Sequence, residues 1–158
     1  MHEAFADKSV DAVLTAIGGF NAVELLSQID YGLIKANPKI FCGFSDITAL
    51  SCAIYAKTGL VTYSGPHFSS FGMLKGFDYT LDCFKKCFFQ KEAFALCPSP
   101  EWSDDPWYLN QDERHFVRND GIWAIRPGKA EGTIIGGNLG LLDELKGCLL
   151  YTSPSPRD

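Results

Sequence analysis

Ser45 lies in the part of the sequence whose residue types and spacing could support covalent chemistry. The segment Ile40–Cys42 is short and apolar, as is typical of a buried strand. From Ile47 onward the apolar side chains recur at helical spacing, so Gly43-Phe44-Ser45-Asp46 forms a turn between a strand and a helix. A serine at such a turn points out of the sheet, and the first N–H groups of the helix could stabilise an oxyanion. This is the geometry of a nucleophile elbow.

Spacing alone leaves two interpretations of this turn open. The elbow signature of hydrolases is G-x-S-x-G, and Ile47 replaces its second glycine here. Alternatively, Ser45 or Asp46 caps the helix by accepting a hydrogen bond from a backbone N–H group. Without further context, the capping interpretation is the simpler one.

The neighbouring elements predict an α/β fold, with a parallel sheet flanked by helices. We expect strands over Asp11–Ile17, Ile40–Cys42 and Leu60–Tyr63, with helical patterns between them. This alternation favours right-handed crossovers, and ligands of such sheets bind beyond the carboxyl ends of the strands. The turns at Gly18-Gly19, Ser45 and Ser64–His67 would all open on that edge.

The Gly18-Gly19 turn also has two interpretations. Its glycines could let the backbone approach a phosphate or an oxyanion, or they could simply allow a tight turn. No complete nucleotide-binding glycine motif is present, which disfavours a nucleotide site. Asn21, followed three residues later by Glu24, predicts a capping-box start for the next helix.

A nucleophilic serine needs a base, and the sequence contains His2, His67 and His115. His67 would share the sheet edge with Ser45, but we interpret it as a polar residue of the pocket wall. His115 lies in a charged loop, where a solvated role is expected. Ser103-Asp104-Asp105 is interpreted as a solvated turn, because no spaced set of metal ligands accompanies it.

The second half of the chain is richer in glycine and aromatic residues. We expect a helix over Tyr79–Phe89 and strands over Phe94–Cys97, Ile122–Ile125 and Ala130–Ile135. The last two strands would start a second, mostly β domain that is truncated. Residues 98–121 form a long connection. Loops of that length are usually functional or disordered, and aromatic side chains such as Trp102 and Trp107 argue against disorder.

Composition narrows the class of protein. The 158 residues suit a soluble globular chain, with 46% hydrophobic residues and a net charge of −5. There is no basic patch for nucleic acid and no apolar stretch long enough to span a bilayer. We therefore expect no nucleic-acid or membrane partner and a cytoplasmic location. The six cysteines form no C-x-x-C pair and are interpreted as reduced core residues.

Several separated motifs resemble the LD-carboxypeptidase family of serine peptidases (S66). They include Ile17–Asn21, Asn37–Leu50, Lys57–Leu60 and Gly65–Met73. The Trp102–Tyr108 loop and the segment Glu131–Leu139 resemble the microcin C immunity branch of that family. The resemblance covers residues 1–147 and favours the elbow interpretation of Ser45.

The resemblance implies a Ser-His-Glu hydrolase without a metal or cofactor. Ser45 would be the nucleophile, and the backbone N–H groups of Asp46 and Gly19 would form the oxyanion hole. The residues assigned to substrate binding are Gly18, Asn21, His67, Trp102 and Trp107. The substrate would be a murein-type peptide or an aminoacyl-nucleotide antibiotic, whose base could stack on the tryptophans. Those tryptophans could equally be packing residues of the core or a lid. A homodimer is also among the expected partners.

The resemblance also predicts an incomplete site. In the family, the catalytic glutamate and histidine follow the Gly-Gly-Asn-Leu segment, so neither His67 nor His115 is promoted to the triad. We expect a partial nucleophile domain at 1–97, an aromatic substrate or lid loop at 98–121, the start of a C-terminal domain at 122–147 and a non-family tail at 148–158. The alternative is an inactive fragment, or a binding module that uses its glycine turns for an anionic ligand.

Overall fold

The computed structural model describes residues 1–146, which divide into two compact units. Unit 1 contains residues 1–68 together with the segment that begins at Ile134, and unit 2 contains residues 69–133. The predicted tail at 148–158 lies outside the described residues. The domain boundaries predicted from the sequence stay predictions.

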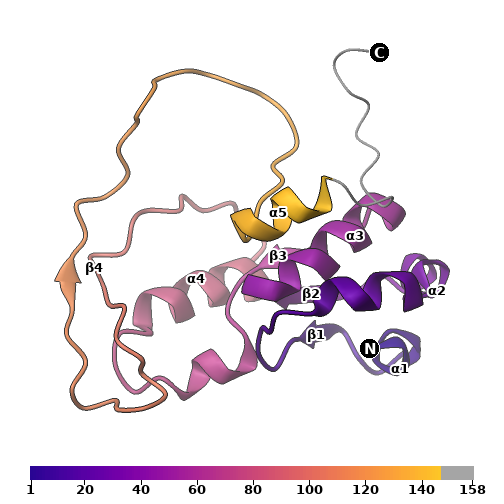
Figure 1. Ribbon diagram of the computed structural model, residues 1–158, viewed down its shortest axis with the longest axis horizontal. Coiled ribbons are helices and arrows are strands. Elements are labelled where there is room, and N and C mark those ends of the chain that lie inside the picture. The colour runs from indigo at the N-terminus through magenta and orange to yellow at the C-terminus, as the bar shows by residue number, and fades with distance from the viewer. Residues whose placement is uncertain (147–158) are drawn as a thin grey trace. The chain divides into compact units, whose positions relative to one another are not determined.

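Unit 1 is built on a parallel sheet of three strands, as predicted, in the order β1-β2-β3 (Figure 1). The strands are β1 (Ala12–Leu14), β2 (Ile40–Gly43) and β3 (Tyr63–Ser64). Val13 lies opposite Phe41, and Gly43 lies opposite Ser64. Phe41 and Cys42 point to opposite faces of the sheet, and each is 1% exposed. Both faces of the central strand are therefore covered.

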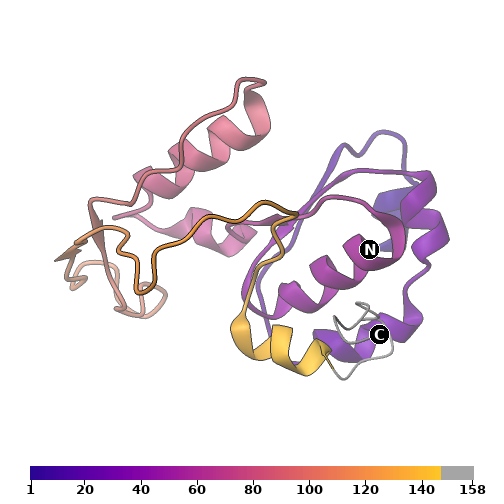
Figure 2. The ribbon, with the colours of Figure 1, turned by 90° about the horizontal axis from the view of Figure 1, so that it is seen from above.

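Helices supply the rest of the unit 1 core. They are α1 (His2–Ala6), the 3-10 helix η1 (Ala22–Gln28), α2 (Tyr31–Ala36), the 3-10 helix η2 (Ser45–Ile47), α3 (Thr48–Thr58) and α5 (Leu139–Leu145). Ala49, Ala53 and Ile54 of α3 are almost fully buried, and Leu145 of α5 joins the same cluster. Accordingly, α5 lies beside α3 in both Figure 1 and Figure 2.

Two helix ends form as their residues predict. Helix α2 stops before Asn37-Pro38, because the residue before a proline is disfavoured in the helical region. Helix α3 ends at Gly59, which adopts the left-handed conformation with φ of 76°. The chain then leaves α3 and continues to β3 at Tyr63.

The strands β1 and β3 differ from their predicted bounds. The strand expected over Asp11–Ile17 is only β1. Beyond it, Thr15 N still donates to the Cys42 carbonyl at 3.0 Å, but the Thr15 carbonyl accepts from Phe68 N at 2.8 Å, outside any strand. The strand expected over Leu60–Tyr63 is shifted to β3. Leu60 N donates to the Thr58 hydroxyl, so it is not available to the sheet ladder.

Unit 2 contains η3 (Phe68–Gly72, whose first residue belongs to unit 1), α4 (Asp78–Phe89) and the antiparallel pair β4 (Glu101–Trp102) and β5 (Val117–Arg118). Helix α4 confirms the helix predicted over Tyr79–Phe89. Its Phe84 ring packs against Phe71 and Phe88, with centroids 5.1 and 4.7 Å apart.

The three strands predicted over Phe94–Cys97, Ile122–Ile125 and Ala130–Ile135 are wrong. Their apolar residues are largely exposed, Ile122 and Ile125 among them, and within residues 1–146 no strand pairs with them. High β propensity does not form a strand without a partner to pair with. The only strand pairing in unit 2 is β4 with β5, inside the predicted loop.

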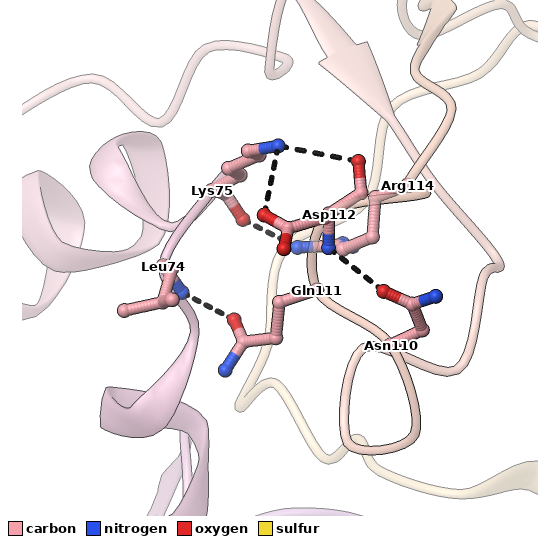
Figure 3. Close-up of polar contacts among 6 residues, drawn as sticks. All are labelled: Leu74, Lys75, Asn110, Gln111, Asp112 and Arg114. Carbon is pink, nitrogen blue, oxygen red and sulfur yellow. Dashed lines mark hydrogen bonds and ion pairs between the residues drawn. The ribbon is translucent and has the colours of Figure 1, made fainter.

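The loop that contains the tryptophans is fastened to residues 72–76 of the same unit by polar contacts (Figure 3). Leu74 N donates to Gln111 Oε1 at 2.6 Å, and Lys75 Nζ lies 3.7 Å from Asp112 Oδ1. The Arg114 guanidinium donates to the Lys75 carbonyl and lies 4.9 Å from the centre of the Phe116 ring. The loop is therefore an ordered part of unit 2.

The cysteines only partly match their expected burial. Cys42 and Cys52 are buried, and burial raises the pKa of the Cys52 thiol. Cys87 and Cys97 are exposed, so the interpretation of these two as core residues is wrong. Cys148 lies outside the described residues. Within residues 1–146, no helix is long and apolar enough to cross a membrane.

Candidate active site

The turns that follow β1, β2 and β3 meet around Ser45. A β-carbon added to Gly18 would lie 3.1 Å from Ser45 Cβ and 3.4 Å from His67 Nε2. The turns after three adjacent parallel strands therefore come together at the carboxyl edge of the sheet. This arrangement agrees with the expectation that the three turns open on the same edge.

Ser45 has an unusual backbone conformation. Its φ of 58° is the only positive value among the non-glycine residues that the structure describes. A left-handed conformation costs an L-residue roughly 1–2 kcal/mol, so the surrounding structure must hold the turn in place. Ser45 starts η2 directly after β2, and this confirms the strand-to-helix turn predicted from the sequence.

We expect the strain at Ser45 to be measurable as a stability difference. The variant Ser45→Gly should have a free energy of unfolding about 1 kcal/mol higher than Ser45→Ala, because glycine adopts positive φ without a steric penalty. Urea unfolding of the two variants, neither of which has the hydroxyl, provides the comparison. Equal stabilities would show that the turn is not strained.

The side chains of this turn do not cap its helices, so the capping interpretation is wrong. Neither η2 nor α3 has a side-chain hydrogen bond at its N-cap. Asp46 Oδ2 instead accepts from Asn21 N at 3.1 Å and Ala22 N at 2.9 Å. Asn21 makes no side-chain cap bond to η1, so the predicted capping box is also absent. The capping group for η1 comes from the Ser45 turn.

His67 is buried beside the serine turn. Its Nε2 lies 3.1 Å from the Phe44 carbonyl oxygen, and its ring stacks on Phe44 with centroids 3.7 Å apart. A carbonyl oxygen only accepts, so Nε2 must carry the hydrogen of this bond. That nitrogen cannot also take a proton from Ser45. The interpretation of His67 as a residue of the pocket wall stays a prediction.

The segment 136–138 also reaches the elbow helix, which the sequence did not predict. Asn138 N donates to Thr48 Oγ1 at 2.9 Å, and a β-carbon on Gly137 would lie 2.4 Å from Thr48 Cγ2. Asn138 then caps α5 through its side chain, which accepts from Leu141 N. Glycine at position 137 is a residue type that indicates a close backbone approach, but no pattern in the sequence indicates which residue it approaches.

The remaining predicted residues belong to unit 2. Trp102 of β4 is 46% exposed. Trp107 is half-buried, would contact a β-carbon on Gly72 at 3.6 Å and packs edge-on against Tyr108. The structure thus leaves Trp102 more accessible than Trp107.

His115 is paired with a carboxylate of the Ser103-Asp104-Asp105 turn. Its Nδ1 lies 3.3 Å from Asp105 Oδ2, and the side chain is 85% exposed. The hydrogen bond from the His115 backbone N–H holds the pKa of the Asp105 carboxyl below its usual value. Within residues 1–146, no group of three histidine, cysteine, aspartate or glutamate side chains is placed to hold a metal ion.

Comparison with protein families gives a match at the start of the chain. Residues 1–65 match the model of the LD-carboxypeptidase N-terminal domain. The protein YocD of Bacillus subtilis (strain 168) is 56% identical over 147 residues, which are 93% of this chain and 45% of YocD. The matched region includes the Ser45 turn.

Comparison with solved structures also gives matches over most of this chain. The MccF-like protein of Bacillus anthracis (str. Ames) has a TM-score of 0.90 at 56% identity, over 92% of this chain and 44% of that chain. The microcin C7 self-immunity protein MccF, in complex with aspartyl sulfamoyl adenosine, has a TM-score of 0.79 at 37% identity, over 92% of this chain and 46% of that chain. The chain thus spans less than half the length of these relatives.

Proposed function

Since the chain belongs to the LD-carboxypeptidase family, and to its MccF-like branch, we propose that it carries the nucleophile of a serine peptidase. Ser45 is the proposed nucleophile. Its hydroxyl would attack the carbonyl carbon of an amide bond and give its proton to the base of the whole protein, forming a tetrahedral intermediate. Cleavage of the C–N bond, with that proton passed to the departing amine, would leave an acyl-enzyme that water hydrolyses to the acid and free serine.

The observation that carries this proposal is the conformation of Ser45. A positive φ at a non-glycine residue costs free energy, and such strain is concentrated at functional sites. The residue is a serine, it follows a parallel strand directly, and it starts a helix. An ordinary N-cap of the helix that follows explains none of this, because the turn makes no side-chain capping bond to η2 or α3.

The proposed oxyanion hole consists of backbone N–H groups from two turns. Asp46 N lies in the first turn of η2, where amides have no acceptor inside the helix. Gly19 lies close enough that a β-carbon there would be 3.1 Å from Asp46 Oδ2. Two such donors would stabilise the negative charge that develops on the carbonyl oxygen.

We do not assign the base to a histidine of this chain. His67 Nε2 is bonded to a carbonyl oxygen, and His115 is paired with Asp105. The Ser-His-Glu triad is expected from the family resemblance, and we propose it for the whole protein.

The proposed substrate is an amide of one of two classes. One is a murein-type peptide, and the other is an aminoacyl-nucleotide antibiotic of the kind suggested by the ligand of MccF. The exposed face of Trp102 favours the second class, because an indole ring can stack on a nucleobase. We propose that the tryptophan loop discriminates between these substrates.

The test is a comparison of two substrates with the protein expressed from its natural gene. For Trp102→Ala combined with Trp107→Ala, we expect kcat/KM for an aminoacyl sulfamoyl adenosine to fall about tenfold more than kcat/KM for a murein tetrapeptide, the loss of one to two stacking contacts. The ratio of the two values does not depend on the fraction of folded enzyme. Trp123→Ala, an exposed tryptophan outside the predicted set, is the matched control.

Equal losses on both substrates would contradict the stacking role and leave the tryptophans as packing residues. A wild-type protein that hydrolyses neither substrate would contradict the peptidase proposal itself.

A further inference from the structure

The Asp46 side chain links the two turns that would form the oxyanion hole. Its Oδ2 accepts hydrogen bonds from Asn21 N at 3.1 Å and Ala22 N at 2.9 Å. These amides lie 25 and 24 residues away in the sequence. Local helix capping does not explain such bonds, because they connect the turn after β2 to the turn after β1.

The same oxygen also lies close to Gly19. A β-carbon at Gly19 would be 3.1 Å from Asp46 Oδ2, which is closer than most real contacts of that kind. The glycine therefore leaves room for the carboxylate to reach the two amides that follow. A single oxygen atom thus contacts the turn from Gly19 to Ala22.

The Asp46 carboxylate is well placed to hold this turn firmly. The residue is 5% exposed, so water competes little for its oxygen. Hydrogen bonds to an ionised acceptor are shorter and stronger than those between neutral groups. Asn21, the residue at the N-cap of η1, makes no side-chain cap bond that could replace them.

We propose that the Asp46 carboxylate is a positioning residue that fixes the Gly18–Ala22 turn against the Ser45 turn. It would hold the Gly19 N–H at a constant distance from the Asp46 N–H. This inference rests on the proposed function, in which these two N–H groups bind the oxyanion. One residue then supplies one donor with its backbone and positions the other with its side chain.

The test uses Asp46→Ala and Asp46→Asn in the protein expressed from its natural gene. Asp46→Ala should slow phosphonylation of Ser45 by a fluorophosphonate about 10²-fold, as expected when an oxyanion donor is misplaced. Asp46→Asn keeps an acceptor oxygen of the same shape and should lose about tenfold. For amide hydrolysis, kcat should fall by similar factors while KM changes little, because the contact acts on the transition state.

Asp30→Ala is the matched control. The Asp30 carboxylate also accepts a backbone N–H at a helix start, from Leu33 at 2.8 Å, but it caps α2. The Asp30→Ala substitution should lower the melting temperature, as the loss of a helix cap does, and should leave the phosphonylation rate of the folded protein unchanged.

Amide hydrogen exchange tests the positioning without any reaction. In Asp46→Ala, exchange at Asn21 and Ala22 should accelerate at least about tenfold. Thr15 N, which donates to the Cys42 carbonyl of β2, and Phe68 N, which donates to the Thr15 carbonyl, should keep their rates. Equal acceleration at all four amides, or equal rate losses in Asp46→Ala and Asp30→Ala, would overturn the inference.

The two proposals can fail separately. A wild-type Ser45 that does not react would overturn the peptidase proposal, and with it the catalytic purpose of Asp46. The exchange measurement would still show whether the carboxylate fixes the turn. A reactive Ser45 whose rate is insensitive to Asp46→Ala would overturn the positioning role alone.

Discussion

Ser45→Ala should lower kcat for amide hydrolysis by on the order of 10⁶-fold, with little change in KM. The substitution removes the oxygen that would form the acyl-enzyme, but it leaves the substrate contacts and the oxyanion donors in place. Some rate above that of water should remain, because binding and oxyanion stabilisation survive the loss of the nucleophile. Steady-state kinetics of the protein expressed from its natural gene, with a murein tetrapeptide or an aminoacyl sulfamoyl adenosine, measures the effect.

Ser51→Ala provides the control on the same stretch of chain. Ser51 belongs to α3, and among residues 1–146 its buried hydroxyl has no hydrogen-bond partner. Its removal should leave kcat within about twofold and should not lower stability, because an unsatisfied buried hydroxyl contributes nothing favourable. A Ser45→Ala variant that retains more than about a tenth of the wild-type rate would show that Ser45 is not the nucleophile.

Gly43→Ala should strongly destabilise the protein at the start of the serine turn. A β-carbon at Gly43 would lie 2.2 Å from Thr15 Oγ1 and 2.9 Å from Ile47 Cγ2. Thr15 Oγ1 donates to the Cys42 carbonyl at 3.3 Å, and Ile47 is a buried, β-branched residue, so neither can move freely. We expect the free energy of unfolding to fall by about 2–3 kcal/mol, as is typical of overpacked cores.

Gly43→Ala should also lower kcat of the molecules that remain folded. Relief of the clash must move β2 or η2, and a shift of about 1 Å at a nucleophile costs roughly 10²-fold in rate. Urea unfolding and kcat per folded molecule separate the two effects. Gly136→Ala, where a β-carbon would meet open space, should leave both unchanged. A Gly43→Ala variant as stable as wild type would contradict the tight packing of the turn.

The parallel sheet and the serine turn could be predicted because the residue pattern of each element favours the structure that it adopts in the fold. Ile40–Cys42 is apolar and flanked by turn residues, and the helix that follows has a clear period. The structure places β2 and α3 accordingly, with Gly59 at the helix end. A strand buried on both faces and a glycine-terminated helix are features that a single sequence encodes locally.

The strands of the second half could not be predicted in the same way. Ile122–Ile125 has the composition of a strand, but a strand also needs a neighbour, and composition does not specify one. Glu101–Trp102 and Val117–Arg118 pair instead, although each is too short to show a period. Pairing across a loop depends on the turn contacts between them, which the sequence pattern does not reveal.

The contacts of Asp46 were also beyond sequence reasoning. The spacing of Asn21 and Glu24 indicated a local capping box, but a carboxylate from another turn took that role. A local pattern cannot show that a residue distant in sequence will satisfy the same amides. The serine was therefore predictable, whereas the residue that holds its neighbouring turn was not.

The most direct test of the central claim is to identify the residue that reacts with a fluorophosphonate. The protein expressed from its natural gene would be labelled, digested and mapped by mass spectrometry, with heat-denatured protein as the control. We expect one modified serine, Ser45, in the folded protein and none after denaturation. Modification of another serine, or labelling of Ser45 no faster than in the denatured control, would contradict the assignment of Ser45 as the nucleophile.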